Sequence, residues 1–134
     1  MGDHGQLRSL VERYAAVVDR RRFAELGDVF LSTGVLVTGH GTRDGLDEIR
    51  AVMEGLHRYE ATDHRVGASR FTVEGDAARG QVECEAHHWS TVDGERIDRV
   101  MVITYHDTYE RTAAGWRIVH RRLEIHRQED VPAR

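Results

Sequence analysis

The chain has 134 residues, of which 40% are hydrophobic and 31% charged, with a formal net charge of −4 and one cysteine. This length suits one domain, and apolar runs far shorter than about 20 residues argue against a membrane-spanning helix. The acidic balance argues against a nucleic-acid partner, and a lone cysteine cannot form an internal disulfide. We therefore expect a cytoplasmic protein with one domain over residues 1–134, whose ends, residues 1–5 and 128–134, are loose.

The chain begins with helical periodicity. Apolar residues recur every three or four positions over residues 6–21, which is one face of an amphipathic helix. A second, short helical stretch covers residues 23–30. Ser32-Thr33-Gly34 then breaks the period, and the β-branched run at residues 35–37 predicts a strand.

A third helix is expected after a loop at residues 39–45. Asp44 is the predicted N-cap, because its side chain can accept a hydrogen bond from the first turn. Asp47 and Glu48 stand in that turn, where the helix dipole favours acidic side chains. The apolar spacing continues from there, so we expect the helix to end near His57.

The second half of the chain changes to a period of two residues, which is typical of strands. We expect four strands, at residues 62–73, 78–89, 97–110 and 116–127. Along the second of them, small apolar residues and His88 share the inward phase, whereas charged residues and His87 point outward. Helices followed by an antiparallel meander predict an α+β fold with a strongly curved sheet.

Several short motifs occur in a fixed order: Tyr14 with Asp19, Phe23-x-x-Leu26-x-x-x-Phe30, Thr62-x-His64, Gly75-Asp76, Tyr105-x-Asp107-x-Tyr109 and Gly115-Trp116-Arg117-Ile118. With the order of elements, they resemble the SnoaL-like families of polyketide cyclases, scytalone dehydratase and bile-acid dehydratase, in the nuclear-transport-factor-two-like superfamily. The resemblance implies an α+β barrel, in which a cone-shaped antiparallel sheet, mixed with one N-terminal strand, wraps around the N-terminal helices. It also implies a homodimer and one deep pocket for a small hydrophobic molecule.

Four polar side chains are the catalytic candidates, because polar groups are costly to bury in an apolar pocket without a use. Tyr14 lies on the apolar face of the first helix and could donate a hydrogen bond to a substrate oxygen, or be a core tyrosine. Asp19 is close to the C-terminal end of that helix, where the helix dipole disfavours a carboxylate, and in dehydratase members the matching aspartate works beside the pocket histidine. The alternative for Asp19 is a solvated carboxylate in a surface run of arginines.

The two histidine candidates follow from strand phase. His64 shares the phase of Val66 and Ala68 and is the candidate base, with a structural core histidine as the alternative. His88 is favoured over His87 as the second pocket residue, unless a one-residue bulge reverses the phase.

Inward phases also predict the binding residues, which are Val18, Phe30, Met53, Leu56, Val66, Cys84, Trp116 and Arg122. Arg122 shares a face of the last strand with Trp116 and could anchor a substrate carboxylate or carbonyl, or form a salt bridge. Both faces of this strand carry apolar residues, which favours a homodimer through the outer face. We expect no metal and no nucleotide cofactor, because neither ligand spacing nor a glycine-rich phosphate loop is present.

The leading hypothesis for function is a cofactor-independent, dehydratase-like lyase or isomerase that moves a proton beside a carbonyl. In it His64 is the base, Asp19 orients the base, and Tyr14 holds the developing oxyanion. The same groups would serve a polyketide or terpenoid cyclase. The rival hypothesis is a non-catalytic ligand-binding or assembly subunit, which predicts that these three side chains do not converge or that side chains fill the pocket.

Overall fold

The structure, a computed structural model, describes residues 2–133. Its elements are α1 (Asp3–Asp19), the 3-10 helix η1 (Phe23–Asp28), β1 (Phe30–Thr38), β2 (Gly41–Asp44), α2 (Leu46–Glu54), the 3-10 helix η2 (Gly55–Arg58), β3 (Ala61–Glu74), β4 (Ala77–Val92), β5 (Glu95–Thr112) and β6 (Gly115–Pro132). The six strands form one sheet in the order β2-β1-β6-β5-β4-β3. β1 and β6 are parallel, and the other neighbours are antiparallel. This arrangement confirms the predicted α+β fold with a mixed, curved sheet.

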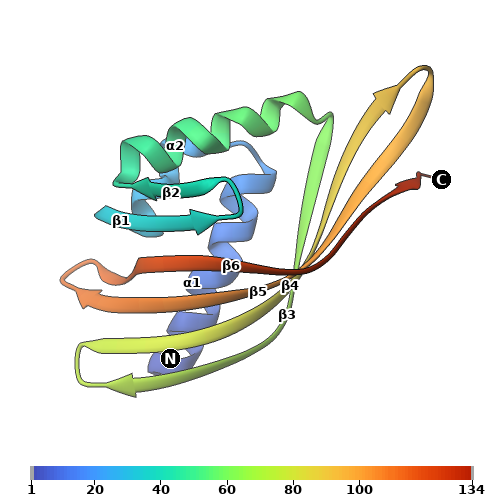
Figure 1. Cartoon of the computed structure of the whole chain (residues 1–134). Helices are drawn as coiled ribbons and strands as arrows, with labels where there is room; N and C mark the ends of the chain where they lie inside the picture. Colours follow the sequence, from blue (N-terminus) through green and yellow to red (C-terminus); the bar gives the residue numbers. More distant parts are fainter. Residues whose placement is uncertain (1, 134) are drawn as a thin grey trace.

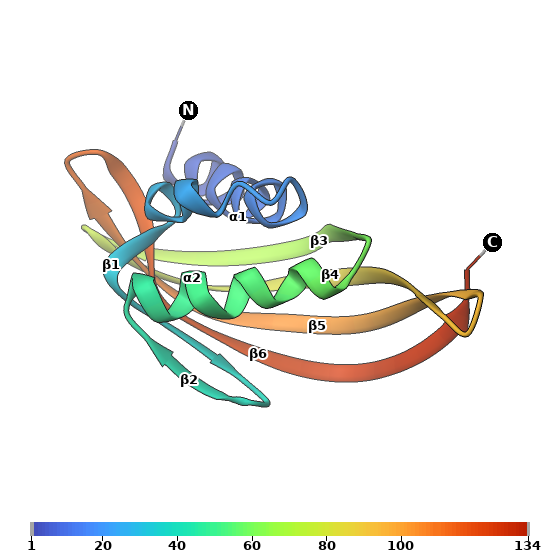
Figure 2. The same cartoon turned by 90° about the horizontal axis from the view of Figure 1, so that it is seen from above.

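The core lies between the helices and the sheet, with α1 against β3 and α2 against β1 (Figures 1 and 2). α1 buries apolar side chains at the predicted spacing, including Leu7, Val11 and Val18. They meet inward side chains of the sheet, such as Val82 and Ile118, in one hydrophobic cluster. Full burial of such a side chain stabilises a fold by about 1.5–3 kcal/mol, so packing rather than intrinsic propensity holds the helix in place.

Both predictions of loose termini are wrong. Residues 3–5 belong to α1, and Asp3 accepts hydrogen bonds from Arg111 Nη1 at 2.6 Å and Trp116 Nε1 at 3.2 Å. At the other end β6 continues to Pro132, which pairs with Ile97 of β5. Met1 and Arg134 lie outside the described residues. The ends are ordered because distant parts of the chain supply their hydrogen-bond partners, which local sequence cannot show.

The segment before α2 also differs from its prediction. Residues 41–44 form β2, a short strand that pairs with β1, so the predicted loop is a hairpin. Gly45, with a φ of 93°, is the N-cap residue in place of Asp44. The capping contact runs in the opposite direction, because the Asp44 backbone N–H donates to Glu48 Oε1 at 3.2 Å.

A bulge in β6 reverses the phase predicted for the last strand. Thr108 pairs with His120 and Tyr109 pairs with Ile118, so Val119 is an extra residue without a partner in β5. An extra residue turns every following side chain to the other face of the sheet. Arg121, which is fully buried, therefore points inward, and Arg122 is exposed on the outer face.

β3 contains a similar bulge. Val66 pairs with Cys84 and Ser69 pairs with Val82, so Gly67 and Ala68 together face one residue of β4. The predicted inward phase holds up to Val66 and is wrong at Ala68, which is exposed. The bulge leaves His64, on its N-terminal side, facing the interior.

Candidate active site

A cavity of about 440 Å³ lies on the inner side of the sheet, within the size range of small-molecule sites. α1, the β1–β2 hairpin, α2, η2 and β3 to β6 all contribute side chains to it. Six of the predicted pocket residues line it: Tyr14, Val18, Met53, Leu56, His64 and His88. Most of the remaining wall is apolar, with contributions from Leu36, Val52, Met101, Ile103, Leu123 and Ile125.

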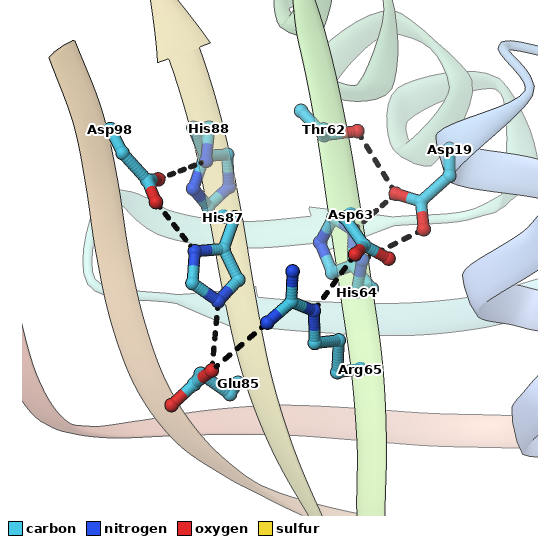
Figure 3. A network of polar contacts seen from close by, with 9 residues as sticks. All are labelled: Asp19, Thr62, Asp63, His64, Arg65, Glu85, His87, His88 and Asp98. Atoms are coloured by element: carbon cyan, nitrogen blue, oxygen red, sulfur yellow. Dashed lines mark hydrogen bonds and ion pairs between the residues drawn. The ribbon is translucent and has the colours of Figure 1, made fainter. Parts of the chain in front are cut away.

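His64 lines this cavity. It pairs with Asp19, which is not part of the cavity lining (Figure 3). Asp19 is the last residue of α1 and reaches across to β3, where His64 Nδ1 lies 2.7 Å from Asp19 Oδ1. The His64 backbone N–H donates to Asp19 Oδ2 at 2.7 Å, and Thr62 Oγ1 donates to Oδ1 at 2.9 Å. The side chains of His64 and Asp19 are only 8% and 20% exposed. The predicted alternative of a solvated surface aspartate is therefore wrong.

The carboxylate determines how the imidazole is oriented. Burial alone would raise the pKa of Asp19, but the hydrogen bonds from His64 and Thr62 lower it below its usual value, so Asp19 is ionised. An ionised carboxylate can only accept hydrogen bonds, so His64 Nδ1 must carry the proton. In the neutral ring Nε2 then keeps its lone pair and can accept a proton from a bound molecule.

His88 supplies a second imidazole, whose ring centre lies 5.7 Å from that of His64 and 5.0 Å from that of Tyr59. Its Nδ1 lies 2.9 Å from the carbonyl oxygen of Arg99, an acceptor, so Nδ1 carries a proton here as well. Burial lowers the pKa of His88, and the nearby His64 adds to this effect. His88 is thus a neutral hydrogen-bonding group, whereas His64 has a carboxylate as the partner of its Nδ1.

His87 lies on the opposite face of β4, as predicted (Figure 3). Its Nδ1 is 2.6 Å from Asp98 Oδ2 and its Nε2 is 2.8 Å from Glu85 Oε2. Arg65 extends this outer network, since its Nη1 lies 3.7 Å from the same Glu85 oxygen. Both ring nitrogens of His87 are occupied, so it offers no free atom to a ligand.

Tyr14 lines the cavity, and its ring packs edge-on against Phe30 and Tyr105. Burial raises the pKa of Tyr14 to about 12, so its hydroxyl remains protonated and can donate a hydrogen bond at neutral pH. The guanidinium carbon of Arg121 lies 4.4 Å from the ring centre. Tyr14 thus has both a core role and a place at the cavity wall.

The other five predicted binding residues are not part of the cavity lining. Phe30 is buried beside Tyr14, and Cys84 is buried in the core, where burial raises the pKa of its thiol to about 11. Val66 lines a separate groove between α1 and β3, together with Asp19 and His64. Trp116 donates to Asp3 near the start of α1, and Arg122 faces outward. The alternation along a strand identifies which residues face inward, but it does not show which part of the inner face borders the cavity.

The sequence reasoning missed Tyr59, Arg43, Arg58 and Arg99, which all line the cavity. Arg43 belongs to the unpredicted strand β2, and Tyr59 follows η2, where no periodicity exists to assign a face. Arg99 shares the phase of Met101 and Ile103 on β5, so the alternation on that strand was a usable signal.

A buried ion pair was also missed. Arg121 Nε donates to Asp107 Oδ1 at 2.8 Å, Arg121 Nη2 donates to Asp107 Oδ2 at 2.7 Å, and the Tyr109 hydroxyl donates to Oδ2 at 2.6 Å. Asp107 and Tyr109 share the inward phase of β5, which is a signal that sequence carried. Arg121 became their partner only through the bulge at Val119.

Within residues 2–133, no cluster of three or more histidine, cysteine or acidic side chains is arranged to hold a metal ion. No helix in that range is long and apolar enough to cross a membrane. The predicted homodimer stays a prediction, which light scattering at micromolar concentration would test.

Comparison with known proteins identifies the family. The SnoaL-like domain family matches residues 1–122. The chain belongs to this SnoaL-like family. The uncharacterised protein Rv2910c of Mycobacterium tuberculosis (strain H37Rv) is 26% identical over 127 residues, and the match covers 90% of this chain and 84% of that protein. The resemblance predicted from the sequence motifs is thereby confirmed.

Solved structures share the fold of this SnoaL-like chain. A protein from Novosphingobium aromaticivorans assigned as a scytalone dehydratase has a TM-score of 0.86 at 19% identity, and the match covers 98% of this chain and 89% of that one. A hexachlorocyclohexane dehydrochlorinase, LinA type 2, has a TM-score of 0.85 at 16% identity, with 98% and 90% covered. At these identities the likeness shows the fold alone.

Proposed function

We propose that this SnoaL-like protein is a cofactor-independent lyase or isomerase that transfers a proton on a small, largely apolar substrate with a carbonyl group. The observation that carries the proposal is the 2.7 Å contact between His64 Nδ1 and Asp19 Oδ1 at the cavity wall. A carboxylate behind an imidazole stabilises the imidazolium that forms when Nε2 takes a proton. The fold shared with a dehydratase and a dehydrochlorinase supports an elimination.

The proposed dehydration needs only side chains of the cavity. His64 Nε2 removes a proton from the carbon beside the carbonyl, and the C–H electron pair forms an enolate whose oxygen accepts a hydrogen bond from Tyr14. The enolate then expels a β-hydroxyl group, which leaves as water with the proton from the His64 imidazolium. His88, as a neutral ring with a free Nε2, accepts a hydrogen bond from that hydroxyl group and positions it.

An isomerase would differ only in the last step, because the imidazolium would return the proton to another carbon. The same first step would begin the ring closure of a polyketide or terpenoid cyclase, which stays the alternative. A non-catalytic subunit predicts that Tyr14, Asp19 and His64 do not converge or that side chains fill the pocket. The hydrogen bond between Asp19 and His64 and the open cavity beside His64 support the catalytic proposal instead.

A panel of β-hydroxy ketones with one to three fused rings tests the proposal, since dehydration creates a conjugated enone with a new ultraviolet band. Exchange of the α-protons in heavy water, followed by NMR, detects isomerase-type proton transfer on the same panel. We expect His64→Gln and Asp19→Asn to lose the activity, while His126→Gln, a change at an exposed histidine, retains it. The proposal fails if no compound reacts faster than in buffer, or if His64→Gln reacts as fast as the wild type.

A further inference from the structure

The charged side chains that line the cavity are all basic. Its lining contains three arginines, Arg43, Arg58 and Arg99, and no carboxylate among the residues that the structure describes. The whole chain has the opposite balance, with 23 acidic residues against 19 Lys and Arg. Positive charge at the wall of a low-dielectric cavity attracts anions and raises their local concentration.

The three arginines differ in their partners. Arg99 forms two hydrogen bonds to Asp130, at 2.8 and 3.1 Å, so its charge is neutralised within the protein. Arg58 donates to the carbonyl oxygen of Gly55 at 3.1 Å and lies 4.8 Å from the centre of the Tyr59 ring. Arg58 is exposed, so water also solvates it. Neither therefore needs a ligand to satisfy its guanidinium.

Arg43 differs from Arg58 and Arg99 because part of its guanidinium group is buried without a hydrogen-bond partner in the part of the chain that the structure describes. It pairs with Leu36 across the β1–β2 hairpin, and directly opposed residues share one face of the sheet, so both line the cavity. The Nε atom of Arg43 is buried and has no hydrogen-bond acceptor among residues 2–133. No ion pair to Arg43 occurs there either, although Glu48 lies close enough to line a neighbouring groove with it. The Glu48 carboxylate instead accepts from the Asp44 backbone.

A buried guanidinium donor without an acceptor is costly, and an anionic oxygen that reaches it removes this cost. From these observations we infer that the ligand of the cavity is an amphiphilic organic anion: an apolar body with an acidic group, such as a carboxylate or a phosphate ester, that Arg43 binds. The acidic group specifies the substrate class, and the Asp19–His64 pair acts elsewhere on the same molecule. The inference rests on the proposed function only in treating this ligand as the substrate.

Two fluorescent probes with the same apolar body test the inference by equilibrium binding. 1-Anilinonaphthalene-8-sulfonate carries a sulfonate, and N-phenyl-1-naphthylamine is its uncharged counterpart. We expect the wild type to bind the anionic probe about tenfold or more tightly than the neutral one, because charge-assisted hydrogen bonds have about that effect. The preference should shrink as salt is added. Equal binding of the two probes by the wild type would overturn the inference.

Variants assign the preference to Arg43. Arg43→Met should abolish most of the anion preference while binding of the neutral probe stays within about twofold, which also shows that the cavity is intact. Arg43→Lys should keep part of the preference, because the charge remains but the planar donor geometry is lost. Arg122→Met is the matched control on the outer face and should behave as the wild type. An anion preference that survives in Arg43→Met would contradict the assignment.

Competitors separate the possible acidic groups, since dodecanoate, dodecyl phosphate and dodecanol can each displace the neutral probe. Displacement by dodecanol as strong as by both acids would count against an anionic ligand. This binding result is independent of turnover, so the two proposals fail separately. If Arg43 selects anions but no β-hydroxy ketone is dehydrated, the proposed function falls alone. If neutral β-hydroxy ketones are dehydrated as fast as their acidic analogues, this inference falls alone.

Discussion

Two carboxylates inside the molecule each bind a basic side chain at 2.7 Å, Asp19 with His64 and Asp107 with Arg121, yet the pairs serve different ends. The Asp107–Arg121 pair is enclosed, with side chains 0% and 1% exposed, and the Tyr109 hydroxyl donates to the same Asp107 Oδ2 as Arg121 Nη2. In the Asp19–His64 pair, His64 lines the cavity and uses its Nδ1 to bind Asp19, which leaves Nε2 as the nitrogen for a bound molecule. A buried pair is available for chemistry only if one partner keeps an unoccupied titratable atom beside an open space.

Aromatic rings complete the enclosure of the first pair. The guanidinium carbon of Arg121 lies 3.9 Å from the ring centre of Tyr105 and 4.4 Å from that of Tyr14. One nitrogen, Nη1, has no hydrogen-bond acceptor in the described part of the chain, so the ring faces are its main electrostatic partners. Tyr14 therefore links the two regions, because its ring covers Arg121 and its side chain lines the cavity.

The largest expected effect is on turnover at the open pair. His64→Ala should lower kcat by about two to four orders of magnitude on any β-hydroxy ketone that the wild type dehydrates, the usual contribution of a positioned base. Its effect on the free energy of unfolding should be small, about 1 kcal/mol, because Asp19 keeps the hydrogen bonds from Thr62 and the His64 backbone. Denaturant titration and enzyme assay of the same preparation measure both. A large loss of stability with unchanged turnover would mean that His64 is structural.

At the enclosed pair the expected effect is on stability. Arg121→Met should lower the free energy of unfolding by about 3–5 kcal/mol, since it leaves the Asp107 carboxylate buried without its cation. Arg122→Met, one position along the strand, should change it by less than about 0.5 kcal/mol because that side chain is exposed. Urea denaturation of the two variants compares them directly. Equal losses in the free energy of unfolding for both variants would contradict the bulge at Val119, which turns Arg121 inward and Arg122 outward.

If Arg121→Met does not fold, a double variant keeps the comparison testable. Arg121→Met with Asp107→Leu removes both charges, and replacement of a whole buried pair by apolar groups is often close to neutral. We expect the double variant to be more stable than Arg121→Met alone. A double variant that is less stable than the single one would show that Asp107 does not depend on Arg121.

The smallest expected effect concerns pH and the outer face of β4. Burial alone would lower the pKa of His87, but its hydrogen bonds to Asp98 and Glu85 raise it above the ordinary value of 6.5. A histidine with a raised folded-state pKa contributes stability that is full below about pH 6.5 and is lost as the pH rises through the folded-state pKa. The melting temperature of the wild type should therefore exceed that of His87→Gln most at pH 6, and the difference should shrink towards pH 9. A difference that grows with pH would contradict the raised pKa.

The inward positions of His64 and His88 were predicted correctly because their cues are local: both lie in strands whose alternation is undisturbed near these positions. That Asp19 stands beside His64 was implied by the family resemblance rather than by spacing, and the structure brings the two together. The prediction failed for Arg122 because a bulge depends on how two strands align, which the sequence of one strand does not show. It failed for Trp116 because alternation tells which face of the sheet a side chain is on, but not whether it lies beside the cavity or, like Trp116, beside Asp3 at the start of α1. Arg43 was missed because residues 41–44 become a strand only through pairing with β1.

The sequence by itself determined the order of helices and strands apart from β2, and the face on which each histidine of β4 lies, since these follow from periodicity over a few neighbouring residues. It also indicated the family, through the resemblance of its motifs and their order. The tertiary structure decided which inward residues meet empty space, which arginine is buried, and which cation of the cavity lacks a partner. Such features depend on how the strands pair, which brings Leu36 opposite Arg43 and Asp107 opposite Arg121. No local pattern encodes them, because one inserted residue moves every later side chain to the opposite face.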